Sequence, residues 1–160
     1  MKEEFSLEKL QQAIEYNLTN DGFLVPIIFM CTHAGMEVLD ASEYMESDEG
    51  KDKLIDSLCS YVPEKGIYKI YIVSEAWSYV MPKDMEERDV KRLLQTTAYR
   101  EKLSRVEVYQ IIEITETGAS MLCRQFARED DEIVLGDTLK IDDAQLVRFA
   151  PVQKCLRVLN

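Results

Sequence analysis

Apolar residues recur at three- and four-residue steps in two segments of the chain, and this spacing predicts two amphipathic helices. Ser6 and Ser47 are the expected N-caps, because a serine hydroxyl accepts a hydrogen bond from the first free backbone amides. Gly22 is expected to end the first helix, and Pro63 with Gly66 the second. The two apolar faces consist of Leu7, Leu10, Ile14 and Leu18 within residues 7–19, and of Leu54, Ile55, Leu58, Cys59 and Val62.

Continuous or alternating apolar runs predict strands around these helices. Residues 23–31 form one such run, and Pro26 within it indicates an edge strand or a bulge, because proline cannot donate to a ladder. His33-Ala34-Gly35 is expected to turn the chain, so that residues 36–39 return as a hairpin partner. Residues 67–80 are apolar at both alternating sets, which is typical of a central strand.

The second half of the chain predicts mainly strands that short turns connect. Before them, residues 82–104 combine helical apolar spacing with a heavy charge load, which predicts a short helix within a long excursion. Turns are expected at Glu116-Thr117-Gly118, at residues 128–131 and at Gly136-Asp137. The strands expected between them cover residues 105–115, 119–127, 133–135 and 146–149.

These elements predict an α+β fold. Short turns between successive strands imply antiparallel pairing, so we expect a mainly antiparallel β-sheet with two or three α-helices packed on one face. A chain of 160 residues has the length of one domain and can bury about two thirds of its unfolded surface. We therefore expect a single domain over residues 1–160.

Acidic residues dominate the chain and limit the partners that it can bind. Asp and Glu number 30 against 19 Lys and Arg, which gives a net charge of −11. This charge argues against direct binding of nucleic acid or of an anionic membrane. All the arginines lie from Arg88 onward. A solvated acidic surface explains this distribution, and the alternative is an anion site built from arginines of the second half.

The N-terminal sequence and the cysteines predict a cytoplasmic protein. Residues 1–6 carry acids where a signal peptide needs a basic and then an apolar stretch, and the longest apolar run is too short to span a bilayer. No C-x-x-C motif occurs, so the cysteines are expected to be reduced and to pack as small apolar residues. They are Cys31, Cys59, Cys123 and Cys155.

Familiar catalytic and cofactor motifs are absent from the sequence. His33 is the single histidine, and Cys31 is the only possible metal ligand of the Cys or His type near it. A zinc site needs three or four ligands, so His33 is expected to be an ordinary turn residue. No phosphate-binding glycine loop or nucleophile elbow occurs. We expect no metal and no cofactor, and the sequence leaves open whether the protein is an enzyme.

One polar and aromatic group follows the predicted central strand. Glu75 and Trp77 fall on one side of that strand, and Arg105 and Glu107 open the next strand and can lie opposite them. These four residues are the candidate ligand site, because an arginine–glutamate pair beside a tryptophan face can recognise a small polar ligand. The same residues can instead form a structural clamp, in which Trp77 packs against the end of the sheet, Arg105 stacks on Trp77 and a glutamate neutralises the arginine.

The same segment carries a resemblance. Ser74-Glu75-Ala76-Trp77, a polar excursion and Arg105-Val106-Glu107 resemble a group of uncharacterised prokaryotic and phage proteins with the pattern S-E-A-W-M, P-x-R and R-x-E. The chain departs from the pattern at Ser78, where methionine is usual, and at Leu103-Ser104, where Pro-Asp is usual. The resemblance implies a strand–excursion–strand unit over residues 67–114 and implies no function.

Three functions remain as hypotheses. The first is a non-enzymatic interaction or assembly module that forms a homo-oligomer or binds an unknown protein partner through exposed strand edges. The second is a small-molecule-binding protein or an enzyme whose site joins Glu75, Trp77, Arg105 and Glu107. The third is an acidic mimic of nucleic acid, which the charge of −9 over residues 1–80 suggests.

Overall fold

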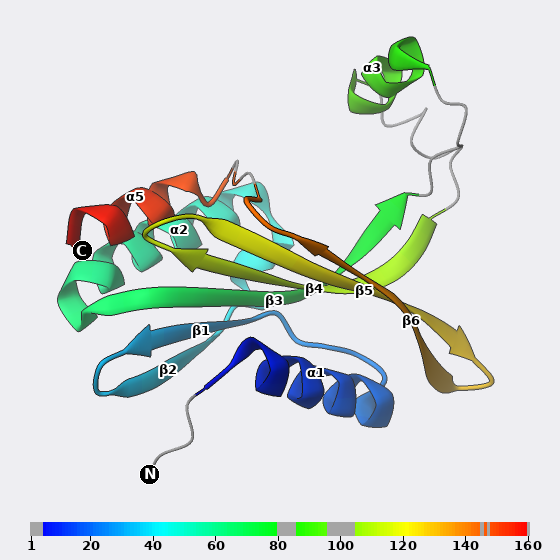
Figure 1. Cartoon of the computed structure of the whole chain (residues 1–160), viewed down its shortest axis with the longest axis horizontal. Helices are drawn as coiled ribbons and strands as arrows, with labels where there is room; N and C mark the ends of the chain where they lie inside the picture. The colour runs from blue at the N-terminus through cyan, green and yellow to red at the C-terminus, as the bar shows by residue number, and fades with distance from the viewer. Residues whose placement is uncertain (1–4, 80–85, 96–104, 145, 147, 160) are drawn as a thin grey trace.

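A six-stranded antiparallel sheet in the order β2-β1-β3-β4-β5-β6 forms the centre of the protein (Figure 1). The computed structural model describes residues 5–79, 86–95, 105–144, 146 and 148–159. The strands are β1 (Ile27–Thr32), β2 (Gly35–Asp40), β3 (Ile67–Tyr79), β4 (Arg105–Thr115), β5 (Ala119–Glu129) and β6 (Glu132–Ile141). The helices are α1 (Leu7–Asp21), the 3-10 turn η1 (Tyr44–Glu46), α2 (Asp48–Lys65), α3 (Glu87–Gln95) and α5 (Ala150–Leu159).

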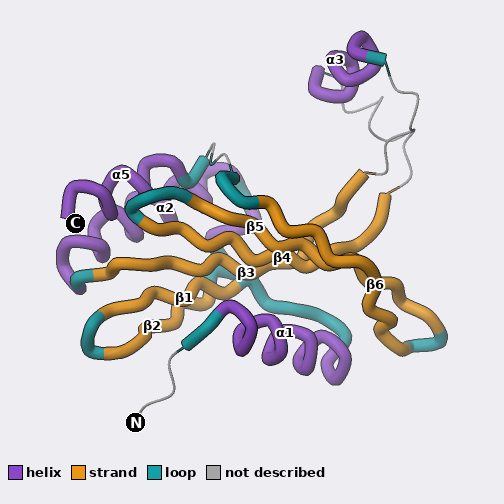
Figure 2. Tube along the Cα trace, viewed as in Figure 1, coloured by secondary structure: helices purple, strands orange, loops and turns teal. Residues whose placement is uncertain are grey.

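The predicted α+β class and antiparallel sheet are confirmed, but the helices cover both faces of the sheet and not one. Figure 2 shows α1 on one side and α2 with α5 on the other. The central strand explains this division. Tyr71 and Val73 of β3 pack in the core under α1, whereas Ile70 and Ile72 pack in the core under α2 and α5. We call these surfaces the α1 face and the α2/α5 face.

Both predicted N-caps are present in the structure. The Ser6 hydroxyl accepts the backbone N–H of Lys9, and the Ser47 hydroxyl accepts that of Gly50. Pro63 does not end α2, because it lies in the last turn and the helix continues to Lys65. None of the helices in the described ranges is both long and apolar enough to cross a membrane.

The first predicted strand is shorter than its apolar run. β1 begins at Ile27, and Pro26 precedes it as part of a connecting segment in which Phe23 is exposed. β1 is also an inner strand, with β2 on one side and β3 on the other, so the predicted edge or bulge at Pro26 is wrong. The Pro26 carbonyl instead accepts the backbone N–H of Ala41 at 2.9 Å.

The end of the chain differs most from the prediction. Gly136-Asp137 does not turn the chain, because β6 continues through these residues. The predicted strand over residues 146–149 is also absent from the described part of that range, which is residues 146, 148 and 149. Leu146 and Phe149 pack against the core, and Phe149 precedes helix α5, which the sequence did not predict. Both Val152 and Leu156 of α5 are fully buried on the α2/α5 face.

A bulge in β6 changes which face its side chains occupy. Thr138 pairs with Arg124 and Leu135 pairs with Phe126, so three steps along β6 match two along β5. Leu135 therefore packs with Phe126 under α1, whereas Leu139 pairs with Cys123 on the α2/α5 face. Alternation alone would have placed Leu135 and Leu139 on the same face.

Candidate functional site

The four candidate residues share one face of the sheet. Antiparallel pairing of β3 with β4 sets Trp77 opposite Glu107, and Glu75 opposite Tyr109. Arg105 lies two positions before Glu107 on β4, so it has the same orientation. Tyr109 is part of the core under α1, which places the candidate residues on the α1 face. The structure therefore brings them together as the pairing of the two strands predicts.

Trp77 and Arg105 form a stacked pair on the surface. The Arg105 guanidinium carbon lies 4.7 Å from the centre of the Trp77 ring, which is cation–π geometry. Trp77 is 53% exposed, so it does not seal the end of the sheet as the clamp interpretation expects. The pair therefore presents an aromatic and cationic surface to solvent.

Glu75 and Glu107 both contact Arg128 of β5, a residue that the sequence predicted to lie in a turn. Arg128 Nε lies 3.1 Å from Glu107 Oε2, and its Nη2 lies 3.9 Å from Glu75 Oε1. Arg128 also donates to the Gly22 carbonyl at the end of α1. Glu75 Oε1 accepts the backbone N–H of Leu24 at 2.7 Å. These contacts tie the segment after α1 to the sheet.

Arg128 lies in β5 because the β5–β6 turn is shorter than predicted. Only Asp130 and Asp131 connect the strands, and both have positive φ, as a tight two-residue hairpin turn requires. The two-residue turn extends β5 to Glu129 and pairs Arg128 with Ile133, and the run of acidic residues around it does not mark this length in the sequence. A hollow of about 550 Å³ beside this turn is lined by Gly22, Arg128 and residues 130–133.

A second polar cluster, which the sequence did not predict, joins α1 to the sheet. Arg124 Nη1 lies 2.6 Å from Glu15 Oε1, and the Tyr109 hydroxyl donates to the same oxygen at 2.5 Å. Gln11 also donates to the Tyr109 oxygen at 3.2 Å. Arg124 Nε donates to the Gly136 carbonyl at 3.0 Å, so one side chain fixes both α1 and the bulge in β6.

The electrostatics of this second cluster favour an ionised Glu15 and a neutral Tyr109. Burial alone would raise the pKa of Glu15, but hydrogen bonds from Tyr109 and Arg124 and the charge of Arg124 lower it below its usual 4.5. Burial and the hydrogen bond to Glu15 raise the pKa of Tyr109. Glu15, Tyr109 and Arg124 thus each have a hydrogen-bond or ion-pair partner within the cluster.

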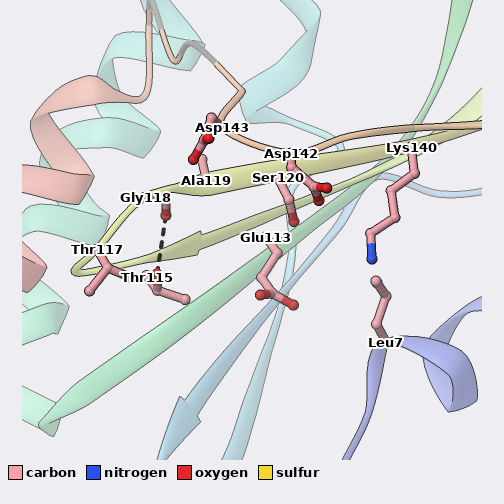
Figure 3. Close-up of a pocket in the computed structure, with 10 residues that line it drawn as sticks. All are labelled: Leu7, Glu113, Thr115, Thr117, Gly118, Ala119, Ser120, Lys140, Asp142 and Asp143. Carbon is pink, nitrogen blue, oxygen red and sulfur yellow. Dashed lines mark hydrogen bonds between the residues drawn. The ribbon is translucent and has the colours of Figure 1, made fainter.

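A shallow polar hollow of about 330 Å³ lies at the other end of β4 (Figure 3). Glu113, Lys140 and Asp142 line it, and their side chains come from β4, β6 and the segment after β6. Tyr71 lies opposite Glu113 in the pairing of β3 with β4, and burial, followed by the charge and hydrogen bonding of Glu113, raises the pKa of Tyr71. Sequence spacing gave no reason to connect Glu113 with Asp142, because the pairing of three strands brings them together.

The single histidine is not part of a described metal cluster. His33 is exposed in the β1–β2 turn and stacks on Tyr68 with 5.1 Å between ring centres, whereas Cys31 is buried. Among the residues that the structure describes, no three His, Cys, Asp or Glu side chains are placed to hold a metal ion.

Comparison with known proteins found no matching family, no matching curated protein and no matching solved structure. The function is therefore inferred from the geometry and chemistry of this chain.

Proposed function

We propose that this protein is a non-enzymatic association module that pairs with a second copy of itself through the outer edge of β6. The observation that carries the proposal is the exposure of large apolar side chains along this strand. Leu139 is 59% exposed and Ile141 is 40% exposed, and both pair with β5 residues on the α2/α5 face. Full burial of such a side chain contributes about 1.5–3 kcal/mol, and burial of the part that is still exposed here stabilises an interface by a fraction of that value.

The two edges of the sheet differ in ways that favour β6. β6 has ten residues, whereas the opposite edge strand, β2, has six. The carboxylate of Glu37 in β2 is held by Lys65 at 2.7 Å, and that of Asp40 accepts hydrogen bonds from Ser42. Such charged side chains protect an edge from pairing. Thr138 to Ile141 in β6 form a regular segment beyond the bulge, and its one charged side chain, Lys140, pairs with Leu122 on the α1 face, away from Leu139 and Ile141.

Pairing of β6 with its copy about a two-fold axis keeps equivalent faces together. An axis perpendicular to the sheet joins the two sheets into one, with the same face of each copy on the same side. Leu139 and Ile141 of both copies then meet on the α2/α5 face, while the backbone groups of Thr138 to Ile141 find partners. The bulge at Gly136 limits the flat pairing segment and thereby helps to set its register.

The polar clusters support a binding role without catalysis. Glu75 and Glu107 are engaged by Arg128 and by a backbone amide, and Glu15 is engaged by Arg124 and Tyr109. A general acid or base needs a proton-transfer group that reaches substrate. The carboxylates of these two clusters are instead used to fasten α1 and its following segment to the sheet.

The test is the oligomeric state of matched edge variants. Leu139→Glu places a charge at the proposed interface, and Val38→Glu places the same charge on the opposite edge, where Val38 is 57% exposed. We expect a dimer for the unaltered protein and for Val38→Glu in sedimentation velocity. Leu139→Glu should weaken dimerisation at least about tenfold, because a buried leucine is replaced by a desolvated carboxylate.

Thermal unfolding of each variant controls for folding, since both altered side chains are exposed in the single chain. A monomeric unaltered protein at all concentrations would contradict the proposal. A dimer that Val38→Glu disrupts and Leu139→Glu leaves intact would assign the interface to β2 instead.

A second candidate function rests on the exposed stack of Trp77 and Arg105. Its aromatic and cationic groups suit a small planar anion, which would lie on the open side of the ring or against the guanidinium. Native mass spectrometry that shows a retained small molecule, lost in Arg105→Ala, would favour this function. Trp77 fluorescence unchanged across a panel of aromatic carboxylates would argue against it.

A further inference from the structure

Two of the four cysteines lie side by side on neighbouring helices. Cys59 of α2 and Cys155 of α5 lie close enough for the Cys155 thiol to help raise the pKa of the Cys59 thiol. Each is partly buried and packs against the core of the α2/α5 face. The helices themselves run beside each other on that face (Figure 1). Both thiols are free in the structure, and both remain partly accessible to solutes.

The other two cysteines are separated by the sheet. Cys31 of β1 is buried in the core under α1. Cys123 of β5 pairs with Gln110 of β4 and thus lies on the opposite face. Strand alternation keeps the thiols of Cys31 and Cys123 on opposite faces. These two cysteines therefore serve as a control pair that should not form a disulfide.

We propose that Cys59 and Cys155 form a reversible disulfide by exchange with a small-molecule disulfide such as oxidised glutathione. In the first step the Cys155 sulfur attacks one glutathione sulfur, which gives a mixed disulfide and releases one glutathione thiol. In the second step the Cys59 sulfur attacks the Cys155 sulfur and releases the second glutathione thiol. Two protein thiols are oxidised, one glutathione disulfide is reduced to two thiols, and the two protons pass to these thiols.

The order of the two steps follows from the surroundings of Cys59. Burial, followed by the hydrogen bond and charge of Cys155 and by the charge of Asp56, raises the pKa of Cys59 to about 11. Cys59 is therefore a poor first nucleophile near neutral pH, since the thiolate is the attacking form. Once Cys155 carries a mixed disulfide, the adjacent position of Cys59 makes the second attack intramolecular.

The bond would fasten the C-terminal helix to the rest of the fold. It closes a loop from residue 59 to residue 155, which contains β3, β4, β5 and β6. Long closed loops restrict the unfolded chain strongly, so a disulfide here should stabilise the folded state. Helix α5 would then be held by a covalent bond in addition to its packing and the contact of Arg157 with the Glu116 carbonyl.

The experiment incubates the full-length protein with oxidised glutathione under native conditions and quenches it with acid. Intact mass and peptide mapping identify the linked cysteines. We expect a Cys59–Cys155 bond in the unaltered protein and in Cys123→Ser, and its loss in Cys155→Ser. The oxidised protein should unfold about 5–10 °C above the reduced protein.

Other outcomes overturn the proposal. Stable glutathione adducts on Cys155 without the internal bond, or a bond that involves Cys31 or Cys123, would show that the geometry does not favour this pair. Peptide mapping of the unaltered protein decides this even where a serine variant folds poorly. Oligomeric state is not involved in the readout, so this test and the test of the β6 interface fail independently.

Discussion

At the scale of single residues, charged side chains fasten the helix α1 and its following segment to the sheet. Arg124 contacts Glu15 of α1 and the Gly136 carbonyl of β6, and Arg128 contacts Glu107 and the Gly22 carbonyl. Antiparallel pairing of β3 with β4 was enough to predict that the four candidate residues share a face. Arg128 was missed because its role depends on a hairpin turn of two residues, whose length the acidic sequence around it does not mark.

Removal of Arg124 should cost more stability than removal of a surface arginine. Arg124 and Glu15 are 27% and 20% exposed at their side chains, so Arg124→Ala leaves a half-buried carboxylate without its cation. We expect a loss of about 2 kcal/mol in chemical denaturation. Arg148→Ala removes exposed pairs to Asp48 and Asp52 and should cost less than about 1 kcal/mol. Equal losses for the two variants would contradict this account of α1.

Ionised Glu15 should make the stability of the protein depend on pH. Its pKa in the folded state lies below the usual 4.5, so its contribution is present above that value and is lost as the pH falls through the folded value. The stability difference between the unaltered protein and Glu15→Gln should therefore shrink from about pH 6 to about pH 3. A difference that stays constant over this range in urea titrations would show that the charge of Glu15 is not involved.

At the scale of elements, the sequence patterns worked where local signals and packing agree. Two capped helices and the long central strand were predicted because their apolar spacing is regular. The helix α5 was not predicted, because the apolar residues just before it, over residues 146–149, were interpreted as a last strand. Pro151, which lies in the first turn of α5, is compatible with a helix because the amide it lacks has no partner there.

The junction between α2 and β3 depends on a glycine. Gly66 has φ +67° and ends α2, with its N–H bonded to the Val62 carbonyl. Gly66→Ala should lower stability by about 1 kcal/mol, because an L side chain is strained at this φ. Gly118→Ala is the matched control, since a Cβ meets no atom within 4 Å at either glycine and Gly118 does not have the positive φ of Gly66. Thermal unfolding of both variants measures the difference, and equal effects would contradict the account.

At the scale of the whole molecule, a large negative charge opposes association while an apolar edge favours it. Two copies of a chain with a net charge of −11 repel each other at low ionic strength. Salt screens this repulsion and leaves the burial of Leu139 and Ile141 largely unaffected. The dimer should therefore become tighter between about 50 mM and about 300 mM salt in analytical ultracentrifugation. A dimer that weakens over this range would point to an interface held by ion pairs.

Hydrogen–deuterium exchange at two protein concentrations tests the β6 interface most directly. The outward amides of Thr138 to Ile141 exchange freely in a single chain and become hydrogen-bonded when β6 pairs with its copy. We expect peptides that cover these residues to gain protection at high concentration, while peptides of β2 remain unchanged. Protection that appears in β2, or exchange in β6 that is independent of concentration while a dimer is present, would contradict the proposed interface.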